Sequence, residues 1–237
     1  MIGEGASAGR VLGLVPARAG SQGLPGKNVR TLAGRPMVAW TLEACRESLV
    51  LDRVVVSTDD EAVAAVATEM GFPPPFRRPD SLSGSQASVI DAVAHALETI
   101  GETWDYVVLL QPTSPLRLGA DIDAAVKVCH VRGASSVIGV SPMLKPQTFY
   151  GRVGGNGLFR PDEPRPDEPV VVNGAVYVGR PDILLERRTF VGPDTLAHIM
   201  PPERGWDVDT AFDFTVCEAL WPHVRGEAAG PLDSIRR

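Results

Sequence analysis

The chain has 237 residues, 44% of them hydrophobic and 22% charged, which is enough to bury the core of one α/β domain with an extension. Its formal net charge of −6 argues against a nucleic-acid partner, because that function needs a clustered basic surface. The 3 cysteines lack C-x-x-C spacing, no apolar stretch is long enough to span a membrane, and Met1 to Arg10 lacks a signal-peptide core, so we expect a reducing, cytoplasmic location and no membrane partner.

The first predicted strand ends in a loop of the kind that binds phosphate. Residues 11–15 are apolar and indicate a buried parallel strand, which Pro16 ends by removing a backbone donor. The glycine-rich loop that follows carries Arg18 and Lys27. Glycines let backbone N–H groups approach an anion and the cations add charge, so the loop predicts a nucleotide triphosphate site. Its spacing matches neither a Walker A loop nor a dinucleotide fingerprint, and a basic surface turn remains the alternative.

Apolar strands and helical patterns alternate along the rest of the chain. This alternation predicts an α/β fold of Rossmann-like type, with an open, mostly parallel sheet and helices on both faces. Asp60 precedes an alanine-rich segment and is predicted to cap a helix there. We expect helices near 37–44, 61–70, 89–99, 120–131, 182–187 and 210–224, and strands near 54–56, 106–110, 136–141, 169–178 and 196–200.

A proline-rich excursion interrupts this alternation. Residues 154–157 predict a hairpin-like turn, and the sequence at 160–169, RPDEPRPDEP, is too rich in proline for a helix or a central strand. No second hydrophobic core is visible there, so we expect a small β-rich element that packs on a partner subunit. The predicted boundaries are a flexible tail at 1–10, one domain over 11–224 with the dimerisation excursion at about 142–178, and a flexible tail at 225–237.

Two acidic residues near the end form a candidate metal site. If 206–208 is a strand, Asp207 and Asp209 project to the same side, and two carboxylates at a strand terminus suit Mg²⁺ on a phosphate substrate. The alternative is that Asp209 caps the helix starting near Thr210 while Asp207 stays solvated. Asp213 is expected to be a first-turn charge rather than a ligand.

Seven motifs in a fixed order resemble a known family. They are LVPAR at 14–18, GLPGKN at 23–28, STDD at 57–60, RP at 78–79, LLQPTSPLR at 109–117, NGAVY at 173–177 and DVDT at 207–210. Together they resemble the acylneuraminate cytidylyltransferases, also called CMP-sialic acid synthetases, over about residues 11 to 221. The resemblance implies transfer of CMP from CTP to the anomeric hydroxyl of a 2-keto acid sugar, with release of pyrophosphate, by a Mg²⁺-dependent homodimer.

The resemblance also assigns roles to individual residues. Arg18, Lys27 and Asp209 are implied to be catalytic, and either Asp209 or a hydroxide on the metal takes the proton of the sugar hydroxyl. The triphosphate would be held by Arg18, Ser21 and Lys27, and the nucleoside by Asn28 and Arg78. The full set implied for the nucleotide is Ala17, Arg18, Ser21, Gln22, Lys27, Asn28, Arg78 and Ala87. The sets implied for the acid sugar and for Mg²⁺ are Gln111, Lys145, Arg165, Asn173 and Tyr177, and Asp207 with Asp209.

Departures from the family pattern leave the acceptor open. Gln22 stands where the family usually has lysine, and Gln147 where it has another, for which Lys145 is the candidate replacement. Arg165 lies in the excursion and is a candidate to act across a dimer interface. The acceptor is sialic, legionaminic or pseudaminic acid, an eight-carbon keto acid sugar or a phosphonate. Two other functions stay open: a nucleotidyltransferase that uses another base, and a non-catalytic nucleotide sensor.

Overall fold

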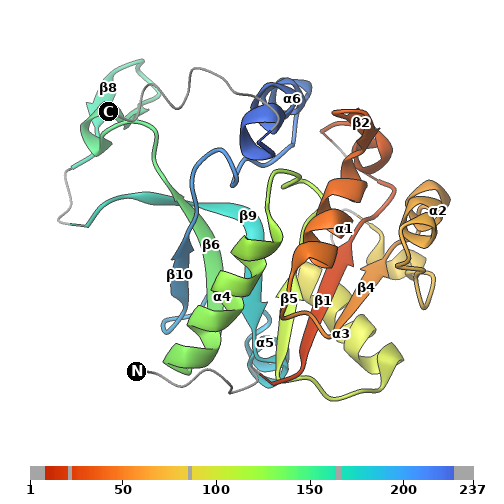
Figure 1. Cartoon of the computed structure of the whole chain (residues 1–237). Coiled ribbons are helices and arrows are strands. Elements are labelled where there is room, and N and C mark those ends of the chain that lie inside the picture. The colour runs from red at the N-terminus through yellow and green to blue at the C-terminus, as the bar shows by residue number, and fades with distance from the viewer. Residues whose placement is uncertain (1–8, 21–22, 85–86, 164–166, 227–237) are drawn as a thin grey trace.

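The computed structural model describes residues 9–20, 23–84, 87–163 and 167–226 (Figure 1). In this part of the chain, no helix is long and apolar enough to cross a membrane. The strands are β1 (Val11–Pro16), β2 (Thr31–Leu32), β3 (Arg35–Pro36), β4 (Arg53–Ser57), β5 (Tyr106–Leu109), β6 (Ser136–Pro142), β7 (Gly151–Val153), β8 (Phe159–Pro161), β9 (Val170–Gly179) and β10 (Leu196–Ile199). The α-helices are α1 (Met37–Glu47), α2 (Glu61–Glu69), α3 (Val89–Ile100), α4 (Gly119–Arg132), α5 (Pro181–Arg187) and α6 (Ala211–Val224).

The central sheet has the order β10-β6-β9-β5-β1-β4. β1 lies parallel to β4 and β5, and β10 lies parallel to β6, so the predicted open, mostly parallel sheet is confirmed. β9 is the exception, because it runs antiparallel to both β5 and β6. The chain leaves the sheet after β6 and returns beside it in the opposite direction, which places β9 between two parallel halves.

Helices cover both faces of this sheet, as predicted (Figure 1). α1, α2 and α4 pack on one face together with Val11 and Val15 of β1. α3 and α5 pack on the other face with Leu12 and Leu14 of the same strand. Alternate side chains of a strand point to opposite faces, so a continuous apolar run is the pattern expected of a strand buried on both sides. The predicted cap is also present, since the Asp60 side chain accepts from the N–H groups of Ala62 and Val63 in α2.

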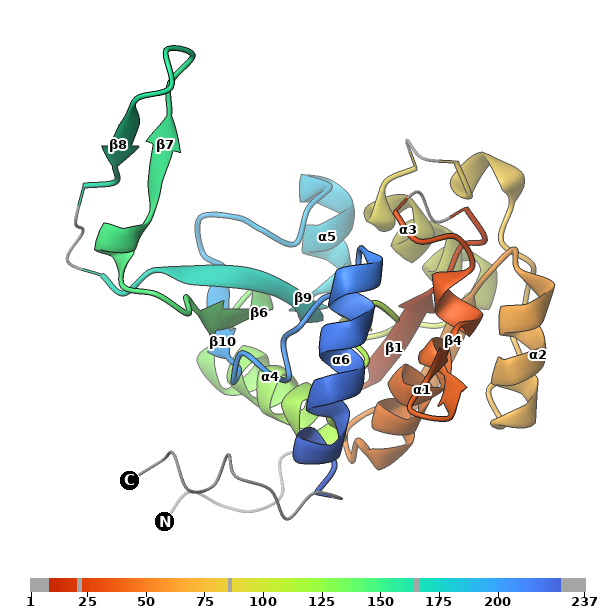
Figure 2. The same cartoon turned by 90° about the horizontal axis from the view of Figure 1, so that it is seen from above.

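α6 lies above one end of the sheet, beside α1 and the small β2–β3 ribbon (Figure 2). Trp221 of α6 packs against Trp40 of α1 with their ring centroids 4.9 Å apart. Leu32 and Val208 are buried in the same cluster. This packing fixes the segment before α6 against the loop that follows β1, and so joins two ends of the chain at one site.

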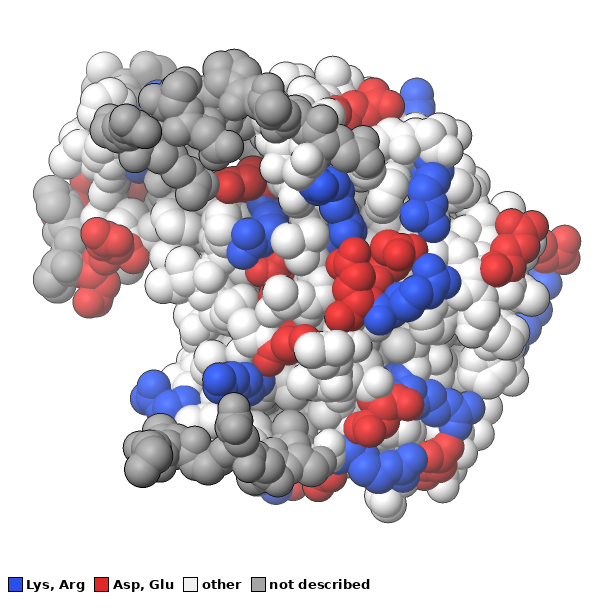
Figure 3. All heavy atoms as spheres, in the orientation of Figure 1, with Lys and Arg blue, Asp and Glu red and all other residues white. Residues whose placement is uncertain are grey.

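The excursion between β6 and β9 forms an arm that projects from the body (Figure 2). β7 and β8 pair antiparallel around the turn predicted at 154–157. On the face seen in Figure 3, basic and acidic side chains lie side by side, and the surface is hollowed beneath the arm. Large apolar side chains are exposed along the arm and the first residues of β9: Leu144, Phe149, Val153, Leu158, Phe159, Val170, Val171 and Val172.

The inner ends of the two predicted tails are held by the domain. The backbone N–H of Arg10 donates to Asp105 at 2.7 Å, and the Arg225 guanidinium donates to Glu47 at 2.7 Å. The remaining parts of these tails, 1–8 and 227–237, lie outside the described residues.

Candidate active site

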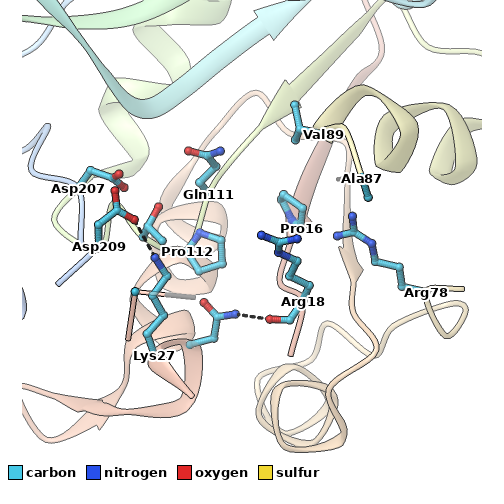
Figure 4. A pocket seen from close by; sticks show the side chains of 13 residues that line it. Pro16, Arg18, Lys27, Arg78, Ala87, Val89, Gln111, Pro112, Asp207 and Asp209 are labelled. Atoms are coloured by element: carbon cyan, nitrogen blue, oxygen red, sulfur yellow. Dashed lines mark hydrogen bonds and ion pairs between the residues drawn. The ribbon is translucent and has the colours of Figure 1, made fainter. Parts of the chain in front are cut away.

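A cavity of about 420 Å³ opens at the carboxyl ends of β1 and β5. Loops at this edge of a parallel sheet are where α/β proteins bind ligands. Lys27, Asp207 and Asp209 lie on one side of it and Arg18 and Arg78 on the other (Figure 4). The lining residues are Pro16, Arg18, Gly23, Lys27, Asn28, Arg78, Ala87, Val89, Gln111, Pro112, Thr113, Asp207 and Asp209.

One side of the cavity carries two guanidinium groups. Arg78 is 4% exposed, and its Nε has no hydrogen-bond partner among the described residues. Burial lowers the pKa of Arg78, while the nearby carboxylate of Asp59 acts against that shift and Arg18 reinforces it. Arg18 donates from Nη1 to the carbonyl of Gly84 at 2.6 Å. Neither arginine takes part in any salt bridge found in the described ranges, so this side can accept an anion.

The opposite side carries a lysine and two carboxylates. Lys27 Nζ donates to the carbonyl of Val208 at 2.8 Å and to Asp209 Oδ1 at 3.0 Å. The Lys27 side chain is 12% exposed, whereas that of Asp209 is 73% exposed, so Asp209 remains open to a ligand. Gly23 packs against the backbone carbonyl of Asp209, where a Cβ would collide. The absence of a side chain at Gly23 therefore lets the first loop approach the two carboxylates.

Asp207 is the more buried of the two acids. Burial raises its pKa, and a hydrogen bond from the Thr113 side chain acts in the opposite direction. Its Oδ1 is buried without a hydrogen-bond partner in the described part of the chain. An unsatisfied buried carboxylate oxygen beside an exposed carboxylate fits a hard cation. Among the described residues, no group of three or more His, Cys, Asp or Glu side chains is arranged so that it could hold a metal ion, so this pair would leave ligand positions for substrate phosphates.

The strand at 206–208, on which the same-side arrangement of Asp207 and Asp209 was conditional, is not formed. The N–H of Val208 donates to the carbonyl of Thr113, and the carbonyl of Val208 accepts from Lys27, so loop groups replace a strand partner. Asp209 does not cap α6 either. Thr210 occupies the cap position and forms a capping box with Asp213, which is consistent with Asp213 as a first-turn charge.

Gln111 lies between the two charged sides of the cavity (Figure 4). It lies two residues after the end of β5, and its Oε1 lies 3.1 Å from the point where a Cβ on Gly174 would stand. Gly174 has φ +73°, and the same point is 3.8 Å from Asp207 Oδ1. A side chain at Gly174 would be strained and would crowd the Gln111 amide, so glycine keeps this end of the cavity open.

The cavity brings together most of the residues expected at the site, although not all. Asn173 is buried, with Nδ2 donating to Ser141 Oγ and Oδ1 accepting from the Ala175 N–H, both at 3.0 Å, so its amide is used within the fold. Tyr177 packs on Phe190 with ring centroids 5.5 Å apart; burial raises the pKa of Tyr177, and the charge of Asp207 adds to the shift. The expected residues that line the cavity are Arg18, Lys27, Asn28, Arg78, Ala87, Gln111, Asp207 and Asp209.

The other expected residues lie elsewhere. Ala17 is buried, and its carbonyl accepts from Thr58 Oγ1, so this hydrogen bond ties the start of the loop after β1 to the segment after β4. Lys145 is exposed at the base of the arm and does not line the cavity. Ser21, Gln22 and Arg165 lie outside the described residues.

Some residues that shape the site were not expected from the sequence. The side chain of Thr113 bonds Asp207, and its backbone carbonyl accepts from the N–H of Val208. Its motif, however, indicates only a turn stiffened by prolines. Asp59 accepts from the N–H of Ala19 at 2.9 Å and lies near Arg78. The sequence signal that could have placed Asp59 at the site is its position just after β4, because the carboxyl ends of parallel strands meet at one edge of the sheet.

Comparison with known protein sequences identifies related enzymes. Residues 12–146 match the family model described as cytidylyltransferase. The chain is 34% identical over 223 residues to a CMP-N,N'-diacetyllegionaminic acid synthase of Legionella pneumophila, covering 89% of this chain and 96% of that protein. It is 37% identical over 221 residues to a pseudaminic acid cytidylyltransferase of Campylobacter jejuni, covering 88% and 94%. An N-acylneuraminate cytidylyltransferase of Escherichia coli is 32% identical over 216 residues, and the match spans 86% of this chain but 50% of that longer protein.

Solved structures support the fold. A CMP:2-keto-3-deoxy-manno-octonic acid synthetase complexed with CTP has a TM-score of 0.69 and 19% identity, covering 90% of this chain and 99% of that one. A 4-diphosphocytidyl-2C-methyl-D-erythritol synthase has a TM-score of 0.70 and 13% identity, covering 90% and 98%. At these identities the similarity concerns the fold alone.

Proposed function

The chain belongs to the cytidylyltransferase family, and on this premise we propose that it transfers CMP from CTP to the anomeric hydroxyl of a nine-carbon 2-keto acid sugar, with release of pyrophosphate. The observation that carries the proposal is the opposition of charges across one cavity. Arg18 and Arg78 lie on one side, and Asp207 and Asp209 lie on the other with Lys27. A nucleotide triphosphate with Mg²⁺ is a ligand that needs both sets.

Nucleotidyl transfer needs positioning and charge neutralisation more than covalent help from the protein. Arg18 and Lys27 would hold the phosphates that leave as pyrophosphate, while Arg78 and Asn28 would hold the nucleoside. Asp207 and Asp209 would hold Mg²⁺, which when bound neutralises charge on the phosphate oxygens and polarises the α-phosphate.

The acceptor would enter at the Gln111 end of the cavity. There the Gln111 amide can bond polar groups of the sugar, and the sugar hydroxyl can approach the α-phosphate in line. The exposed carboxylate of Asp209 is a candidate to take the hydroxyl proton. Relatives named for legionaminic, pseudaminic and N-acylneuraminic acids support a nine-carbon acceptor over an eight-carbon one.

The arm would form a homodimer interface. Its apolar side chains form an exposed patch of the kind that marks protein–protein interfaces, with Phe149 exposed to 72% and Phe159 to 58%. All 3 cysteines are buried free thiols, which agrees with a reducing compartment. Analytical ultracentrifugation of the protein and of Phe159→Asp tests the interface, and a monomeric wild-type protein would refute it.

A pyrophosphate-release screen tests the reaction. The protein is mixed with Mg²⁺, one of CTP, UTP or GTP, and one acceptor from a panel of legionaminic, pseudaminic and sialic acids, an eight-carbon keto acid sugar and a phosphonate. We expect release with CTP and a nine-carbon acid, and none after EDTA treatment. Preference for UTP or GTP would refute the cytidylyl assignment. CTP binding by calorimetry without turnover on any acceptor would instead identify a nucleotide sensor.

A further inference from the structure

Arg117 is a fully buried cation that forms no salt bridge with any described carboxylate, although the charge of Asp121 acts on it. Its side chain is 0% exposed, and burial lowers its pKa to about 10. It takes part in none of the salt bridges found in the described ranges. A buried charge is costly unless it is well hydrogen-bonded, so its three oxygen partners are informative.

Those partners belong to three separate elements. Arg117 Nη1 donates to the carbonyl of Ala175 in β9 at 2.5 Å and to the carbonyl of Gln111 after β5 at 3.3 Å. Nη2 donates to the Thr41 hydroxyl in α1 at 2.9 Å. One planar group therefore joins a strand, the loop that carries Gln111, and the helix beneath them.

Two of these partners, the carbonyls of Gln111 and Ala175, lie just beyond the point where β5 and β9 stop pairing. β5 and β9 pair antiparallel from Val107 opposite Gly179 to Leu109 opposite Tyr177. The same register, continued for two residues, would set Gln111 opposite Ala175. The pairing stops before that point, and the guanidinium bonds both carbonyls in place of ladder partners.

β9 also bulges away from β6 at this point. The register between these strands shifts between Ile138 and Val140, and residues 173–176 face neither neighbour in register. The bulge carries Gly174, whose missing side chain leaves room beside Gln111 and Asp207. Bulges beside active sites commonly redirect the chain, and their backbone groups need other partners.

We propose that Arg117 is a positioning residue that holds the gap between the Gln111 loop and the β9 bulge at the width the acid sugar requires. It touches no substrate and acts through the carbonyls of Gln111 and Ala175. The inference rests on the proposed function, because it names the acceptor end of that same cavity. It predicts a defect confined to acceptor use, whereas the nucleotide side, with Arg18 and Arg78, stays as it is.

Steady-state kinetics of Arg117→Lys tests this. Lysine keeps the charge, but its single ammonium cannot reproduce the fork that joins the Gln111 loop, the bulge and Thr41. We expect KM for the acid sugar to rise about tenfold or more, and KM for CTP to stay within about twofold. Arg117→Ala should show the same split, and guanidinium ion at non-denaturing concentration should restore part of the acceptor affinity.

Two controls separate positioning from general loss of stability. Leu184→Ala removes a buried side chain of α5, at a site the cavity does not include, and gives the effect of destabilisation alone. A double-mutant cycle of Arg117→Lys with Gln111→Ala tests the route, because the two effects on acceptor KM should be strongly non-additive. Unchanged acceptor KM in Arg117→Lys, a parallel loss for CTP and sugar as in Leu184→Ala, or additive effects would overturn the proposal. Failure of the wild-type protein to release pyrophosphate would instead count against the proposed function.

Discussion

Replacement of Gly23 by alanine should separate the phosphate loop from the carboxylates. A Cβ at Gly23 would meet the backbone carbonyl oxygen of Asp209, which cannot rotate away as a flexible side chain can. The two segments would have to separate by about 1 Å to reach an ordinary contact of 3.4 Å. That movement would draw Lys27 away from Asp209 and alter the spacing between the triphosphate cations and the metal ligands.

A misplacement of about 1 Å at a reacting centre costs on the order of 10²-fold in rate. We therefore expect Gly23→Ala to lower the rate of pyrophosphate release from CTP about 10²-fold. Gly23 lies in an exposed loop outside the core, so movement of the loop can relieve the collision and the melting temperature should change little.

The assay is pyrophosphate release at saturating acceptor, with CTP and Mg²⁺ varied, beside a thermal melt of each variant. Gly20→Ala is the matched comparison in the same loop, because no atom of the described residues lies within 4 Å of its Cβ position. Its loss should be at least about tenfold smaller than that of Gly23→Ala. Equal losses in the two variants would refute the reasoning, since they would show that loop entropy rather than the collision with Asp209 controls the rate.

Three further predictions concern charge and burial. Asp207→Asn should reduce pyrophosphate release roughly 10²-fold or more and weaken its Mg²⁺ dependence. Because burial disfavours the Asp207 carboxylate, the same variant should melt no lower than the wild-type protein, and a large fall in melting temperature would contradict this. Arg204→Met should lower the free energy of unfolding by about 2–4 kcal/mol in urea titrations, since it leaves the 3% exposed Asp121 without its bidentate partner; a change below about 0.5 kcal/mol would show that the pair is not structural. Burial raises the pKa of Cys45 and of Cys217 to about 12, so a thiol reagent at pH 8 should react with them only after denaturation. Because the pKa is raised only in the folded protein, the thiols of the unfolded chain ionise first. The free energy of unfolding should therefore fall as pH rises above 9.0, the ordinary pKa of a thiol, and a free energy of unfolding that is independent of pH between 8 and about 10 would contradict this.

Much of the fold could be predicted because local pattern and burial agree. The continuous apolar run of β1 packs against helices on both faces of the sheet, and Asp60 caps α2 as the sequence indicates. The direction of β9 could not be predicted, because it depends on where a long excursion returns to the sheet. The pattern of an apolar strand is the same in either direction.

The candidate site also has a part that could be predicted from the sequence and a part that could not. Charged residues directly after strands could be predicted to meet, since the carboxyl ends of parallel strands share one edge. The arrangement of Asp207 could not be predicted, because its support comes from Thr113 and Lys27 rather than from its own segment. A strand pattern over three residues cannot reveal that a distant loop supplies its backbone partners.

The cavity is built where regular structure is broken. The first loop approaches Asp209 because Gly23 has no side chain, and the acceptor end stays open because Gly174 has none. At both places a backbone carbonyl that has no partner in a helix or strand accepts a hydrogen bond from a side chain distant in the sequence. Lys27 donates to the carbonyl of Val208, and Arg117 donates to that of Ala175. Each cation therefore fixes the distance between two chain segments as well as adding charge. Substitutions that preserve charge while losing this geometry should impair the reaction at one end of the cavity only, which is why lysine at position 117 is a sharper probe than a neutral residue.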